Sequence, residues 1–69
     1  MIHEITAFLK PEYHTEFGTE HTVLYETDGR NTVQDGIDTI IHNGLNLTIN
    51  REVIRVPPSA IYKITSRCT

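Results

Sequence analysis

β-Branched side chains make up a large share of this chain and strongly constrain its fold. Among 69 residues there are nine Ile, four Val and ten Thr, whereas Ala occurs only twice. β-Branched side chains are stiff at χ1 and pack well on a pleated surface, while Ala is the best helix former. The composition therefore predicts a fold built mainly of strands.

Short segments in which apolar and polar residues alternate are separated by residues that favour turns. The alternation is clearest over residues 3–9 and 45–50, and it recurs over residues 22–27. A period of two is typical of strands with one buried face, and Asp28-Gly29 is a turn signal. Five or six short strands spaced in this way predict a single all-β domain over residues 1–69. Its expected architecture is a small antiparallel meander or an SH3-like or OB-like barrel.

The clearest pair of strands is predicted around Asn50-Arg51. This dipeptide can form a tight two-residue turn, because Asn tolerates positive φ. The resulting register places Leu47 opposite Ile54 and Leu45 opposite Val56. All four apolar side chains then lie on one face, which favours this hairpin over a shifted pairing.

Residues 32–43 admit two interpretations, of which a strand is favoured. If His42–Gly44 forms a three-residue hairpin loop with Gly44 in the left-handed conformation, Ile41 faces Leu45 and the apolar face continues. The run Thr39–Ile41 also favours a strand, because β-branched residues are poor helix formers.

The same segment has features of an amphipathic helix. Thr32 is a suitable N-cap with Asp35 three residues later, and Gly44 suits the position after the helix end. Gly36 in the interior counts against a helix. The apolar residues at helical spacing are Val33, Ile37, Ile40 and Ile41. An α+β fold with one helix at about residues 32–43 is therefore the alternative.

The predicted strands share one apolar face, which is the expected core. The polar segment over residues 11–20 contains Gly18 and is expected to be a flexible loop. Residues 67–69 are expected to form a frayed tail. The residues predicted to form the core are Ile37, Ile41, Leu45, Leu47, Ile49, Ile54 and Val56.

The small size of the chain suggests that it associates with further copies. A domain of about 60 residues buries only about 60% of the surface that its unfolded chain exposes. Small scaffolds usually need disulfides, a metal or oligomerisation, and the single Cys68 cannot form an internal disulfide. We therefore expect a homo-oligomer. No apolar run approaches the roughly 20 residues that span a bilayer, so a cytoplasmic protein without a membrane partner is expected.

The motifs of common catalytic sites do not occur in the sequence. It contains neither G-x-S-x-G nor a Gly-rich phosphate-binding loop. Cys68 lies in the predicted tail, which cannot hold a nucleophile in a fixed geometry. We therefore expect a non-enzymatic binding or interaction module that uses no cofactor. By analogy with compact chains of this kind, it is interpreted as an accessory protein of a phage or mobile element that binds a host protein.

Negative charge is concentrated in the first 28 residues, which hold six acidic residues and one Lys, whereas the whole chain has a net charge of −3. An exposed acidic segment can dock on a basic surface of a partner protein, which raises association rate and selectivity. Such charge also serves solubility. The residues predicted to bind the partner are Glu12, Glu16, Glu20 and Glu26.

Two alternative functions use other residues. A nucleic-acid-binding β-barrel would use cations on its surface, although a sequence pI of about 5.7 disfavours it. A metal- or pH-responsive module would use His14 and His21, which flank two carboxylates in one polar segment. The cations of the nucleic-acid alternative are Arg30, Arg51, Arg55 and Lys63.

Overall fold

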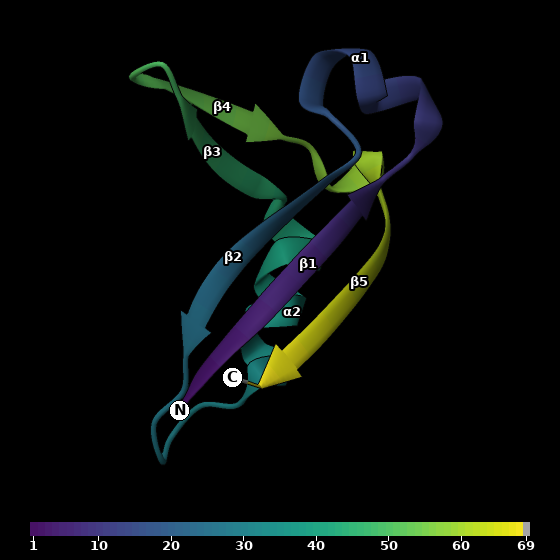
Figure 1. The fold of residues 1–69 in the computed structure, drawn as a ribbon. Coiled ribbons are helices and arrows are strands. Elements are labelled where there is room, and N and C mark those ends of the chain that lie inside the picture. The colour runs from purple at the N-terminus through teal and green to yellow at the C-terminus, as the bar shows by residue number, and fades with distance from the viewer. Residues whose placement is uncertain (69) are drawn as a thin grey trace.

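A three-stranded antiparallel sheet forms one layer of the protein (Figure 1). The structure is a computed structural model and describes residues 1–68. The central strand β1 (Ile2–Leu9) pairs with β2 (Glu20–Glu26) on one side and with β5 (Ile61–Cys68) on the other. The register of the β1–β5 pair shifts between Phe8 and Leu9, at a bulge.

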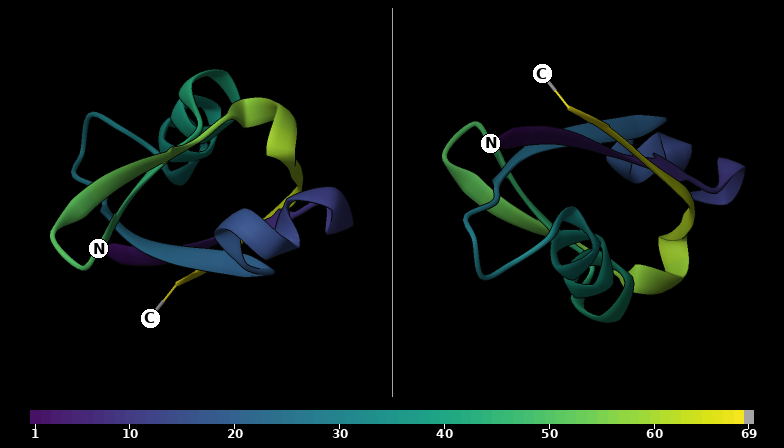
Figure 2. Two further views of the ribbon diagram at one scale, coloured as in Figure 1. Left: turned by 90° about the horizontal axis from the view of Figure 1, so that it is seen from above. Right: turned by 90° about the horizontal axis from the view of Figure 1, so that it is seen from below.

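The second layer consists of helix α2 (Val33–Asn43) and the hairpin of β3 (Leu45–Ile49) and β4 (Glu52–Val56) (Figure 2). Short helical segments complete the connections. The 3₁₀ helix η1 (Pro11–Tyr13) and the one-turn helix α1 (His14–Phe17) join β1 to β2. A further 3₁₀ helix, η2 (Pro58–Ala60), leads from β4 into β5.

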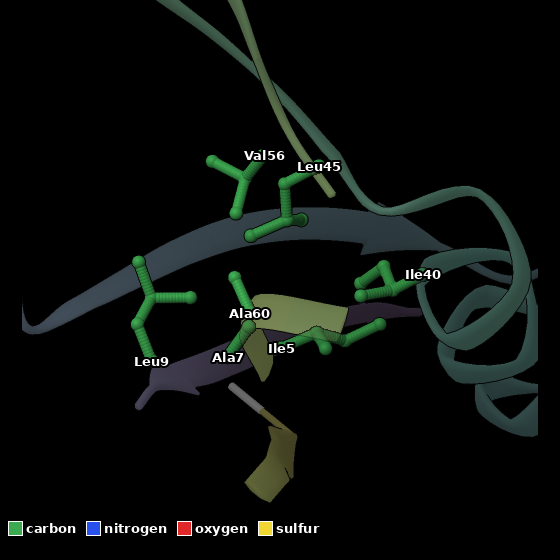
Figure 3. Packing of buried hydrophobic residues seen from close by; sticks show 7 residues of the cluster. All are labelled: Ile5, Ala7, Leu9, Ile40, Leu45, Val56 and Ala60. Carbon is green, nitrogen blue, oxygen red and sulfur yellow. The ribbon is translucent and has the colours of Figure 1, made fainter. Parts of the chain in front are cut away.

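The buried core lies between these layers, where one face of β1 meets α2 and the base of the hairpin (Figure 3). The alternation predicted for residues 3–9 is confirmed, because every second residue from Ile5 to Leu9 is buried. Burial of this apolar face is the main force that holds the layers together. The buried hydrophobic residues are Ile5, Ala7, Leu9, Ile40, Leu45, Val56 and Ala60.

The prediction of a fold built mainly of antiparallel strands is confirmed, whereas the described residues do not form a closed barrel. The β3–β4 pair forms a sheet separate from β2–β1–β5. The outer strands β2 and β5 each border β1 on one side only, so the three-stranded sheet stays open within residues 1–68. In chain order, helix α2 follows β2 where a further strand was predicted.

The favoured strand over residues 32–43 is wrong, and the alternative helix is present. The Asp35 carboxylate accepts a hydrogen bond of 2.9 Å from the Thr32 N–H and completes a capping box. At the other end, Gly44 has a φ of 79°, so the chain leaves the helix in a conformation that glycine adopts without strain. The predicted loop at residues 42–44 and the pairing of Ile41 with Leu45 are therefore not formed.

Gly36 explains why the helix fits on the sheet. A Cβ at this position would lie 2.9 Å from two ring atoms of Tyr25 and 3.1 Å from the Ile5 Cδ1. The missing side chain thus allows α2 to approach β1 and β2 closely. Gly36 has a low helix propensity and therefore counted against a helix, yet the packing of the helix on the sheet requires it.

The predicted hairpin is confirmed in both turn and register. Asn50 and Arg51 have φ values of 51° and 68°, so both central residues are left-handed, as in a type I′ turn. Leu47 pairs with Ile54, and Leu45 pairs with Val56. The base of the hairpin contributes most to the core: Leu45 and Val56 are buried, Leu47 packs against them partly buried, and Ile49 is 45% exposed.

Other predicted features differ from the structure. Among the predicted core residues, Ile41 is 51% exposed, because it lines an open groove between α2 and β5 instead of the buried core. The segment over residues 11–20 contains η1 and α1 and also the first residue of β2. The predicted tail at residues 67–69 is replaced by β5 through Cys68, which pairs with His3, and Thr69 lies outside the described residues.

Candidate functional site

A pocket opens at the end of the sheet where β1 leads into η1. Its volume is about 410 Å³, and most of its lining is apolar. Leu9 is fully buried, and Pro11 begins the next turn of chain. The residues that line the pocket are Phe8, Leu9, Lys10, Pro11, His14, Thr19 and Tyr62.

Two aromatic side chains from different strands form one wall of this pocket. The rings of Phe8 and Tyr62 have centroids 6.4 Å apart and planes tilted by 56°. The Lys63 Nζ lies 4.9 Å from the centroid of the Phe8 ring, which is a cation–π contact. Tyr62 is 60% exposed, so it presents much of its ring to a binding partner.

The two histidines considered as metal ligands each form a hydrogen bond to a backbone carbonyl near the pocket. The His14 Nε2 donates a hydrogen bond of 2.9 Å to the Leu9 carbonyl, and the His21 Nε2 donates to the Phe17 carbonyl. Within residues 1–68, His, Cys, Asp and Glu side chains form no group of three or more suited to a metal ion.

The four predicted acidic residues separate into two places. Glu12 lies in η1, Glu16 lies in α1, and Glu20 begins β2 opposite Phe8. Each of the three is within two residues, in sequence, of a residue that lines the pocket. We call Glu12, Glu16 and Glu20 the acidic end. Glu26 lies at the other end of β2, opposite Ile2. All four side chains are exposed.

The four predicted nucleic-acid-binding cations are spread over different elements. Arg30 lies in the loop before α2, and Arg51 lies in the turn between β3 and β4. Arg55 donates a hydrogen bond of 3.4 Å to the Asn43 carbonyl at the end of α2, and Lys63 contacts Phe8. Two of these cations therefore make contacts within the fold, and the described structure does not gather the four into one patch.

The sequence analysis missed the aromatic wall of the pocket. Phe8 lies on the polar face of its strand by alternation, and the bulge after it changes the register in which β5 presents Tyr62. Bulges often redirect a side chain at a functional site, but no residue pattern marks this one. The one available signal was an aromatic residue at a polar position of an alternating strand.

Within residues 1–68, the helices are too short and too polar to cross a membrane. No protein-family model matches the chain, and no match was found among curated proteins or solved structures.

Proposed function

We propose that this chain is a non-enzymatic interaction module that binds a partner protein at the acidic end. An apolar side chain of the partner fills the pocket, and basic residues beside that side chain face Glu12, Glu16 and Glu20. One observation carries the proposal: an open, mostly apolar pocket of about 410 Å³ is lined by residues that lie next or close in sequence to three exposed Glu residues.

The pocket can provide most of the binding energy. Ligand pockets commonly measure roughly 300–1,000 Å³ and are lined by apolar and aromatic side chains with a few polar groups. Tyr is also enriched among the residues that dominate protein–protein binding, and Tyr62 is both exposed and in contact with Phe8. These features support the binding of an apolar anchor residue.

The carboxylates would contribute mainly to association rate and selectivity. Exposed charge pairs are individually weak, whereas complementary surface potentials speed encounter and reject partners of like charge. Lys10 lines the pocket and Lys63 lies on Phe8, so positive charge is present beside the acidic end. The partner should therefore bring its basic residues to the rim rather than into the pocket.

The test is capture of a partner from nuclease-treated lysate with variants that differ only at the proposed site. Tyr62→Ala and the double variant Glu12→Lys with Glu16→Lys should each lose the protein captured by the natural chain. Glu26→Lys is the control for charge reversal, because Glu26 lies at the far end of β2. Capture that is unchanged in the site variants, or that nuclease abolishes, would contradict the proposal.

A further inference from the structure

The two outer strands of the sheet carry opposite charges. β2 contains Glu20 and Glu26 and no Lys or Arg, whereas β5 contains Lys63 and Arg67 and no Asp or Glu. β2 and β5 lie on opposite sides of β1 (Figure 1). The sheet therefore has one acidic edge strand and one basic edge strand.

These four charged side chains lie on the same face of the sheet. Glu20 and Lys63 both pair with Phe8, and residues paired across antiparallel strands point to the same side. Glu26 and Arg67 follow at even spacing along their strands, so they share that side. This side is the face turned away from the buried core, because Phe8 alternates with the buried residues of β1.

Exposed apolar surface accompanies both edge strands. On β2, Leu24 is 70% exposed, and on β5, Tyr62 is 60% exposed. A groove of about 280 Å³ also runs between α2 and β5. Its lining residues are Ile37, Ile41, Ile61, Tyr62, Lys63 and Ile64.

We propose that a second copy of this chain docks its β2 against β5, so that copies associate head to tail through the edges of their sheets. Outer strands offer unpaired backbone N–H and C=O groups along one side, which another strand can pair with. The buried core holds seven hydrophobic residues, two of which are Ala, so covering the apolar surface at these edges adds to a small core.

Charge decides which edges meet. Pairing β5 with its own copy would bring Lys63 and Arg67 close to the same cations of the second chain. Pairing β2 with its own copy would bring Glu20 and Glu26 close to the same carboxylates of the second chain. Like charges opposite each other destabilise a strand pair, and opposite charges stabilise it. Only the contact between β2 and β5 brings opposite charges together.

The topology sets the direction of this contact and the size of the assembly. β2 and β5 are both antiparallel to β1, so they run in the same direction. A copy that keeps the same face of its sheet outward therefore presents β2 parallel to β5. Each added copy leaves another acidic and another basic edge, so the contact generates a ring or an open filament rather than a closed dimer.

This inference uses the edge strands and goes beyond the proposed function. Its test is sedimentation velocity of the full chain over a range of concentrations. The natural chain should form species larger than a dimer. Lys63→Glu with Arg67→Glu makes both edges acidic, and Glu20→Lys with Glu26→Lys makes both edges basic. Each double variant should associate at least about tenfold more weakly, because favourable pairs become repulsive.

An equal mixture of the two double variants should recover the assembly, since acidic edges then meet basic ones again. Recovery also excludes misfolding as the cause of the loss. Arg30→Glu with Arg51→Glu is the matched control for Lys63→Glu with Arg67→Glu. It lowers the net charge by the same amount, but in two loops instead of an edge strand, so it should assemble like the natural chain. A natural chain that stays monomeric, an assembly that ends at two copies, or a mixture that does not reassociate would each overturn the proposal.

Discussion

Replacement of Gly36 by Ala tests how closely α2 packs on the sheet. The added methyl group would lie 2.9 Å from the Tyr25 Cγ and Cδ1 and 3.1 Å from the Ile5 Cδ1. The Tyr25 Cγ lies on the axis about which the ring turns, so a turn of the ring alone does not move it away from the added methyl group. Ile5 is 1% exposed, so it is enclosed by the core. Relief therefore requires a shift of the helix or a displacement of the whole Tyr25 side chain.

Two opposing effects set the size of the change. Overpacking a core costs roughly 1–3 kcal/mol. Ala is better than Gly in a helix interior by about 1 kcal/mol, which offsets part of that cost. We expect the Gly36→Ala variant to lose about 1 kcal/mol in free energy of unfolding, since this is the difference between typical values of the two effects. For a domain of this size, that loss lowers the melting temperature by about 4–8 °C.

Thermal and urea unfolding followed by circular dichroism measure this loss. Gly29→Ala is the matched control, because nothing lies within 4 Å of a Cβ at Gly29 and its φ needs no glycine. That control should be neutral or stabilising by up to about 1 kcal/mol, through lower entropy of the unfolded chain. If Gly36→Ala stabilises the protein as much as the control does, the close approach of α2 to Tyr25 is refuted.

Three further substitutions test local structure by the same unfolding measurements. Gly44→Ala should cost about 3 kcal/mol or more, because its Cβ would lie 2.0 Å from the Val56 carbonyl oxygen at a φ of 79°; near-natural stability would contradict that contact. Asp35→Ala should cost about 1 kcal/mol by removing the acceptor of the Thr32 N–H, and no change would show that the cap is unimportant. Arg51→Gly should stabilise by about 1 kcal/mol, because Arg51 has a φ of 68°; destabilisation would contradict the left-handed turn.

Sequence patterns correctly predicted the elements whose structure depends only on residues close to one another in the sequence. The alternation in β1 and the Asn50-Arg51 turn each specify which side chains face inward, because a strand has a period of two and a two-residue turn sets the register. The register of Leu47 with Ile54 follows directly from that turn. Such features can be derived without knowing what packs against them.

The helix α2 could not be decided locally because its strongest determinant is a distant contact. Gly36 lowers helix propensity, and the contacts with the Tyr25 ring on β2 and with Ile5 on β1 explain why a larger residue does not fit. Thr32 and Asp35 did carry the capping signal, yet the β-branched run at Thr39–Ile41 pointed the other way. Tertiary packing overrides propensity where the two disagree.

The sequence shows the charges of the candidate site but not its geometry. The excess of acidic residues in the first part of the chain is visible in the sequence, but strand pairing separates Glu26 from the acidic end. Pairing also places Phe8 between Glu20 on β2 and Lys63 on β5, so an acid, an aromatic ring and a base lie in one row across the sheet. The sheet therefore carries no face of a single sign.

The charges are instead separated between the two edge strands, with the acidic residues on β2 and the basic residues on β5. This separation determines which surfaces a partner protein and a second copy of the chain can each contact. A partner at the acidic end contacts the pocket and the residues of η1 and α1, whereas a second copy contacts the length of β2. Glu20 belongs to both regions, because it begins β2 and lies opposite Phe8 in the pocket wall. If both contacts form, they should compete at Glu20, so a saturating partner should reduce the sedimentation coefficient of the assembly toward that of a single complex. Independent binding of partner and second copy would place the partner farther from β2, on the Pro11 and His14 side of the pocket.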